Sequence, residues 1–155
     1  MDTTTSNQTK SSGFTLIEIM LAIAIMAIVV SISLPVYQGY VKEAEISKVI
    51  QEIRQIELLI EDQWQSGGGM PDTLADLGIT LTDPWGNPYQ YLNLRDSKNH
   101  GKSRKDKDLN PINTDFDLYS MGEDGKSISP LTATASHDDI VRANDGNFVG
   151  LATDY

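Results

Sequence analysis

The feature that most constrains this 155-residue chain is a long apolar run near its start. From Phe14 to Leu34 the sequence reads FTLIEIMLAIAIMAIVVSISL, and Glu18 is its only charged residue. As a helix, these 21 residues would span roughly 31 Å, about the thickness of a bilayer's hydrocarbon core. The run is longer than the apolar part of a secretory signal peptide, and no clean cleavage site follows it before Pro35. It also lacks the polar face of a soluble core helix. We therefore expect a retained membrane helix.

Glu18 is the unusual residue of this run. A carboxylate at that depth costs on the order of 3 kcal/mol to insert, so it needs a partner or a proton. We expect its own helix to offer no partner, whereas a neighbouring copy of the chain has a free terminal amine to offer. The alternative is a shallow Glu18 that reaches the headgroups.

The composition excludes several classes of function. Cysteine is absent, which removes disulfides, thiolate metal sites and cysteine nucleophiles. Twelve Lys and Arg against 22 Asp and Glu give a net charge of −10, which opposes binding to nucleic acid. The alternative of a membrane-anchored hydrolase with paired carboxylates is supported by no pocket signature, nucleophile motif or well-placed base. We do not expect an enzyme.

Residues 36–65 change to an amphipathic pattern. Apolar side chains recur there every three or four residues, and charged residues lie between them. The apolar stripe consists of Ile46, Val49, Ile50, Ile53, Ile56, Ile60 and Trp64. The pattern predicts one rod from about Phe14 to Gln65, with this stripe, Trp64 included, packed on a globular domain. Glycines 67–69 and Pro71 end it.

The rest of the chain has weaker signals. Residues 72–77 suggest a short helix capped by Asp72 or Thr73. Strands are expected over Tyr89–Leu94 and Asp115–Met121. Residues 95–107 carry half of the basic side chains and are predicted to form a mobile, solvated loop.

Acidic residues gather near the C-terminus, among them Asp124, Asp138 and Asp139. Carboxylates without histidine or cysteine ligands suit a hard cation such as calcium. The spacing of an EF-hand is absent, however, and the residues alone favour an ordinary acidic loop.

Gly13-Phe14-Thr15-Leu16-Ile17-Glu18, together with the apolar run behind it, resembles the class III signal of type IV prepilins and pseudopilins. In that family a prepilin peptidase cuts after the glycine and methylates the new terminus. The resemblance therefore implies cleavage between Gly13 and Phe14 and N-methylation of Phe14. It also implies that Glu18 pairs with the terminal amine of an adjacent subunit and so sets the register of a helical filament.

A second resemblance is narrower. The stretch Asp83-Pro84-Trp85-Gly86-Asn87-Pro88-Tyr89 resembles the major pseudopilin of type II secretion systems. The family's S-[LM]-G-x-D-G turn and its paired aspartate before Ile are similar to Ser120–Gly125 and Asp138-Asp139-Ile140. The resemblance implies one structural calcium ion held by Asp124, Asp138 and Asp139, with the carbonyl of Met121 as a further ligand.

Together these observations predict a pilin-like α+β fold, in which a long N-terminal helix packs on a small antiparallel sheet with a C-terminal metal-binding loop. The expected divisions are a leader peptide (1–13), a transmembrane and assembly helix (14–35), an amphipathic helix (36–65) and a globular β domain (66–155).

The resemblance implies a structural subunit of the periplasmic pseudopilus that drives type II protein secretion across the outer membrane. Its partners would be further copies in a helical filament, the prepilin peptidase, minor pseudopilins, the inner-membrane assembly platform and the membrane, but no nucleic acid. It would cross the inner membrane of a Gram-negative bacterium once, with its C-terminal domain in the periplasm. The alternative is a type IV pilin or minor pilin of a surface filament for adhesion, motility or DNA uptake.

Overall fold

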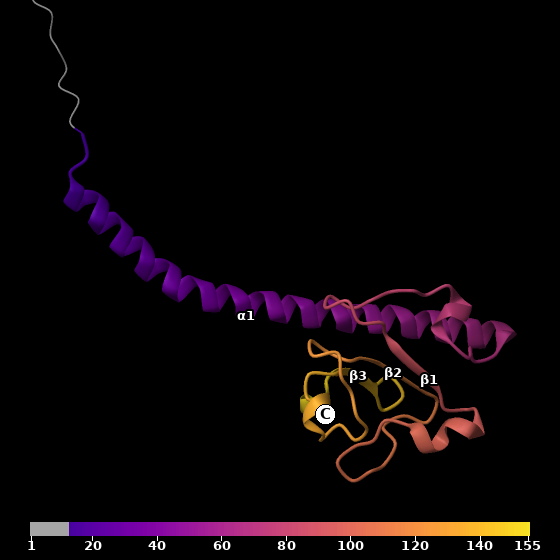
Figure 1. Cartoon of the computed structure of the whole chain (residues 1–155). Coiled ribbons are helices and arrows are strands. Elements are labelled where there is room, and N and C mark those ends of the chain that lie inside the picture. The colour runs from indigo at the N-terminus through magenta and orange to yellow at the C-terminus, as the bar shows by residue number, and fades with distance from the viewer. Residues whose placement is uncertain (1–12) are drawn as a thin grey trace, which may run out of the picture. The chain divides into compact units, whose positions relative to one another are not determined.

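The computed structural model describes residues 13–155, without the side chain of His100. The predicted leader lies outside the described residues except for Gly13. The main helix, α1, runs over Leu16–Gln63 and is followed by a single π-helical turn at Trp64–Gly68 (Figure 1). The rod expected from the apolar pattern is therefore confirmed, and it ends at the glycines. The chain divides into two compact units, one up to Val41 and one over Lys42–Tyr155.

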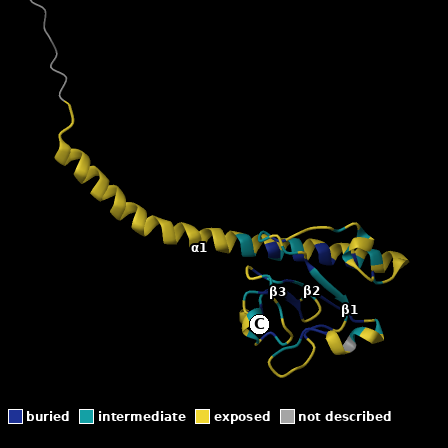
Figure 2. Cartoon of the chain, in the orientation of Figure 1, coloured by how far each residue is buried: buried dark blue, intermediate teal, exposed yellow. Residues whose placement is uncertain are grey.

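In the first unit, every described residue is exposed (Figure 2). Most large apolar side chains of this part of α1, such as Leu21 and Met26, are more than half exposed. By length and composition, α1 is the one helix in the described part of the chain that is able to cross a membrane. An isolated water-soluble chain does not leave so long an apolar surface uncovered, because each such side chain costs free energy in water.

The second unit holds a four-stranded antiparallel sheet in the order β1-β2-β3-β4. The two predicted strands are confirmed as β1 (Gln90–Asn93) and β2 (Phe116–Ser120). The sequence reading missed β3 (Ile140–Ala143) and β4 (Phe148–Leu151), which form a C-terminal hairpin. The turn between them places Asn144 and Asp145 at positive φ, a conformation that these two residue types tolerate.

Successive side chains of a strand point to opposite sides of a sheet, so each strand contributes to two faces. Both faces of this sheet are covered. On one face, the part of α1 in the second unit packs its predicted stripe against β1, β2 and β3, in a cluster of Val49, Ile53, Ile56, Ile60, Tyr89, Phe116, Leu118 and Ile140. The other face, which we call the loop face, is covered by connecting segments, in a cluster of Ile112, Leu131, Val141, Ala143 and Ala152. Together these elements make up the pilin-like arrangement that the sequence predicted.

The predicted short helix is also confirmed, as a 3-10 turn at Leu74–Leu77. Thr73 caps it, and the Thr73 backbone nitrogen donates a hydrogen bond to the Asp76 carboxylate at 2.8 Å. Trp64, however, is 42% exposed and does not belong to the core. It lies where α1 has ended, and the Arg95 guanidinium stacks on its ring at 4.1 Å from the ring centroid.

The prediction of a solvated loop over residues 95–107 is wrong in its centre. Ser97–Lys102 forms a 3-10 helix, and Ser103 and Arg104 are buried. Arg104 lies on the loop face of the sheet, with its guanidinium 4.5 Å from the centroid of the Tyr119 ring. A buried guanidinium must be paired, and its partner is described below.

Replacing Ile56 with alanine is expected to destabilise the second unit by about 2–5 kcal/mol, because the side chain is fully buried and leaves a cavity. Leu58→Ala, two residues further along α1, is the matched control. Leu58 is 64% exposed, and its loss should change the free energy of unfolding by no more than about 0.5 kcal/mol. Urea denaturation of the detergent-solubilised chain measures both. Equal losses would mean that this face of α1 is not the core.

Candidate functional site

The first candidate site is the start of α1. The peptide bond between Gly13 and Phe14 lies in non-helical backbone, and Phe14 is 85% exposed. A Cβ added at Gly13 would meet no atom within 4 Å. The bond that the resemblance marks for cleavage is therefore accessible in this conformation.

Glu18 has partners within its own helix, contrary to expectation. Its Oε2 atom accepts hydrogen bonds from the backbone nitrogen and the hydroxyl of Thr15, both at 2.9 Å. In return, the Glu18 backbone nitrogen donates to the Thr15 hydroxyl at 3.3 Å. This is the reciprocal arrangement of a capping box, which satisfies donors that a helix start leaves unpaired. Thr15 neutralises no charge, however, so an ion-pair partner for Glu18 has to come from outside the helix.

The second candidate site is the turn after β2. It is hydrogen-bonded to the stretch from Asp83 to Tyr89, which we call the proline-rich motif. Asp83 accepts hydrogen bonds from the backbone nitrogen of Asn87 at 2.8 Å and from the hydroxyl of Ser120 at 2.7 Å. The Asn87 side chain donates to the carbonyl of Gly122 at 2.9 Å. The two stretches that carried the narrower resemblance are thus one structural unit. The roles of Asp83 and Asn87 in it were missed by the sequence reading.

The three predicted calcium ligands do not converge. The exposed Asp124 accepts a hydrogen bond from the backbone nitrogen of Lys126 at 2.7 Å, and its own nitrogen donates to Asp138 at 3.0 Å. Met121 starts this turn and is half-buried. Asp139, in contrast, is fully buried on the loop face. Among the described side chains, no three of His, Asp or Glu lie close enough together to hold a metal ion.

The charge of Asp139 is paired within the protein. Its Oδ2 atom accepts hydrogen bonds from Nη2 of Arg104 and, at 2.6 Å, from the Ser127 hydroxyl. The Arg104 side chain is 4% exposed and that of Asp139 is 0% exposed. Burial raises the pKa of Asp139, and the Ser127 hydroxyl and the Arg104 guanidinium act in the opposite direction. The residues present therefore do not fit a calcium ion bound through Asp139 in this arrangement.

A second buried ion-pair cluster lies on the α1 face of the sheet. Arg142, at the centre of β3, donates to Glu57 of α1 at 2.6 Å and to Asp115 at 2.8 Å through two atoms. Its guanidinium lies 3.9 Å from the centroid of the Phe116 ring. Glu57 is one of the charged residues between the apolar positions of the stripe in the sequence, yet it is only 6% exposed. The buried cation that requires its carboxylate stands 85 residues away in the sequence.

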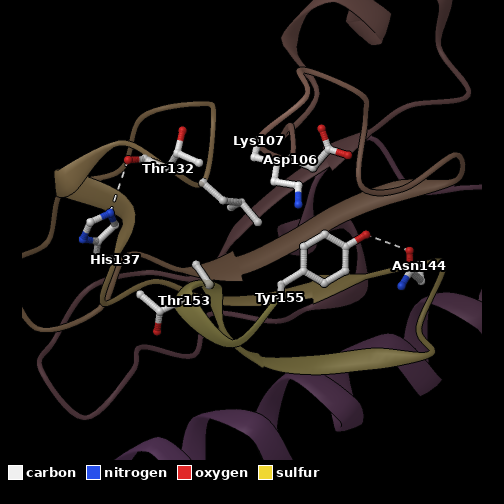
Figure 3. A pocket seen from close by; sticks show the side chains of 9 residues that line it. Asp106, Lys107, Thr132, His137, Asn144, Thr153 and Tyr155 are labelled. Atoms are coloured by element: carbon white, nitrogen blue, oxygen red, sulfur yellow. Dashed lines mark hydrogen bonds between the residues drawn. The ribbon is translucent and has the colours of Figure 1, made fainter.

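A hollow of about 570 Å³ in the second unit offers no catalytic arrangement among its lining residues (Figure 3). His137 is its only imidazole, and the ring lies 3.2 Å from the carbonyl of Thr132. Tyr155 donates to the side chain of Asn144 at 2.7 Å. The other lining residues are Asp106, Lys107, Leu131, Ala152 and Thr153.

Comparison with known proteins finds a family model and several relatives that match this chain. The family model of the prokaryotic N-terminal methylation motif matches residues 8–34. The type II secretion system core protein G of Pseudomonas aeruginosa is 27% identical, over 76% of this chain and 87% of that protein. The core protein G of Aeromonas hydrophila is 26% identical over the same shares.

Fimbrial relatives match more closely but over less of the chain. The fimbrial protein EcpB of Eikenella corrodens is 41% identical over 38% of this chain, and the match spans 37% of that protein. No solved structure matches.

The methylation motif, the long apolar helix and the sheet packed on α1 make up a pilin-like α+β arrangement. Over most of its length, the chain is similar to core protein G of type II secretion systems. These relatives are structural subunits and not enzymes.

Proposed function

We propose that the chain is a structural subunit of the pseudopilus of a type II secretion system. The observation that carries the proposal is the extent of the likeness. The likeness to core protein G covers 76% of the chain, whereas the likeness to EcpB covers 38% of it. The hydrogen bonds of Asp83 with Asn87 and Ser120 support the same assignment, because through them the proline-rich motif holds the turn after β2.

The wider proposal concerns location and partners. A prepilin peptidase cuts between Gly13 and Phe14, and α1 then anchors the chain once in the inner membrane of a Gram-negative bacterium. The globular unit lies in the periplasm. Further copies of the chain, minor pseudopilins and the inner-membrane assembly platform build the filament. The methylation motif and the exposed apolar surface of α1 support this placement.

Deletion of the gene tests the proposed function. Cells that lack the chain should accumulate in the periplasm those proteins that they normally release into the medium, and a plasmid-borne copy should restore release. Fractionation and protein mass spectrometry measure the distribution. If secretion is unchanged but surface filaments, twitching or DNA uptake are lost, the chain is a type IV pilin and the proposal is wrong.

Glu18→Gln separates the two roles of this residue. Glutamine can still accept the hydrogen bonds of Thr15 and so keep the start of α1, but it carries no charge for a neighbour's amine. We expect a variant that is cut and inserted in the membrane yet at least tenfold poorer in filaments, counted by electron microscopy of sheared material. Thr15→Ala is the control, because it removes the capping hydroxyl and keeps the charge. Normal filament numbers in Glu18→Gln would contradict the ion-pair role.

Calcium in the turn after β2 stays a prediction of the family resemblance, with Asp124, Asp138, Asp139 and Met121 as its ligands. The turn itself gives it some support, because Asp124 and Asp138 are adjacent there. The pairing of Asp139 argues against the complete set. Melting the chain with calcium and with chelator tests it, as described next.

A further inference from the structure

The connection between β2 and β3 is long, and hydrogen bonds hold it against the segment around Arg104. The connection runs from Met121 to Asp139. Its middle is tied to residues 103–105 at three successive points. Nη1 of Arg104 donates to the Ser127 hydroxyl at 2.5 Å, the Ser129 hydroxyl donates to the Ser103 carbonyl at 3.2 Å, and the Leu131 nitrogen donates to the Lys105 carbonyl at 2.9 Å.

The segment that carries Arg104 is itself fixed to the sheet. The Arg104 backbone nitrogen donates to the buried carboxylate of Asp117 on β2 at 2.6 Å. The Arg104 guanidinium packs over the ring of Tyr119, two residues along the same strand. Arg104 therefore connects β2, the middle of the connection and its last residue, Asp139.

The charges of Arg104 and Asp139 balance each other without a further ion. Asp139 contributes one buried negative charge and Arg104 one buried positive charge. Nε of Arg104 and Oδ1 of Asp139 are the two buried atoms left without a hydrogen-bond partner among the described residues. They are the donor and acceptor that a side-on, bidentate arginine–carboxylate pair uses alongside Nη2 and Oδ2. In this structure the pair is joined through Nη2 and Oδ2 alone.

We propose that the Arg104 guanidinium takes the place of a bound cation at Asp139, so that the connection between β2 and β3 closes without calcium. An arginine is suited to this task because it stays charged and presents its donors in a fixed fork. The proposal concerns only the second unit, and it holds whether the filament is a pseudopilus or a pilus.

Melting of the full-length, detergent-solubilised chain in excess calcium and in excess EGTA is the first test. We expect the two melting curves to coincide. Arg104→Met should lower Tm on the order of 10 °C or more in both conditions, because it leaves a buried carboxylate without its cation. Asp124→Asn is the matched control. It changes an exposed predicted ligand and should shift Tm by no more than about 2 °C.

A double-mutant cycle isolates the pair. Asp139→Asn should also lower Tm, and the double variant Arg104→Met/Asp139→Asn should lose clearly less than the sum of the two single losses. Arg104→Lys, which keeps the charge but not the fork, should fall between wild type and Arg104→Met. If Arg104→Met does not fold, this lysine variant and the wild-type melts still decide the matter.

Two results would overturn the proposal. One is a calcium-dependent rise in the wild-type Tm that either Asp124→Asn or Asp139→Asn removes, because the loop would then hold the metal. The other is strict additivity of the Arg104 and Asp139 losses. Both concern the loop alone, so neither bears on whether the chain serves secretion.

Discussion

Replacing Gly13 with leucine is expected to leave the chain uncut and free of filaments. The peptide bond after Gly13 lies in exposed, non-helical backbone, and a side chain at this position would touch nothing in the chain itself. A block must therefore arise in the active site of the peptidase, which has to accommodate the new side chain. Intact-mass measurement of the membrane-extracted subunit gives a direct result, because the uncut chain retains residues 1–13 and lacks the methyl group on Phe14.

Gly39→Leu is the control for this experiment. Gly39 lies in the same unit, and a Cβ there also meets no atom within 4 Å. This variant should be cut and methylated as in the wild type. Complete processing of Gly13→Leu would show that the cleavage site lies elsewhere and would remove the basis for assigning Phe14 as the mature terminus.

The second large effect is expected at Arg142. Arg142→Met should lower the free energy of unfolding of the second unit by about 3–5 kcal/mol, because it leaves the carboxylates of Glu57 and Asp115 without their buried cation. Urea denaturation of the detergent-solubilised chain, followed by tryptophan fluorescence, measures the change. The loss should appear as a lower midpoint with an unchanged slope.

Arg54→Met is a closely matched control, since Arg54 also pairs with Glu57, at 3.0 Å. Its side chain is 44% exposed, and pairs of this kind contribute no more than about 1 kcal/mol. A loss at Arg142 as small as that at Arg54 would mean that the buried cluster does not hold α1 to the sheet.

The elements found from the sequence are those whose signal is local. The apolar run, the stripe from Ile46 to Ile60 and the glycines after it predicted α1 to within about two residues at each end. The hairpin of β3 and β4 was missed because Arg142 interrupts the apolar pattern at the centre of β3. Its burial depends on Glu57 and Asp115, and no local pattern joins residues so far apart in the sequence.

The candidate sites divide in the same way. Gly13, Phe14 and Glu18 belong to one contiguous motif, so the sequence predicts their positions together. Asp138 and Asp139 are neighbours in the sequence and were given one role, yet one is half-exposed in a turn and the other is buried. Asp139 directly precedes β3, where successive side chains point to opposite sides of the sheet. Asp139 pairs with Arg104, which is 35 residues away in the sequence, so no local pattern indicates this contact.

The single helix α1 also determines how the subunit carries force. Tension applied along the apolar half of α1 passes along one helix, in which Pro35 lacks a backbone donor, into the half that packs on the sheet. There the load is shared by four buried side chains between Val49 and Ile60, over roughly 16 Å of helix. Glu57 lies among them and is tied to Arg142 in β3. A pulling force on α1 is therefore transmitted to the sheet through several contacts at once. The second unit can move with α1 without its sheet first separating from the helix.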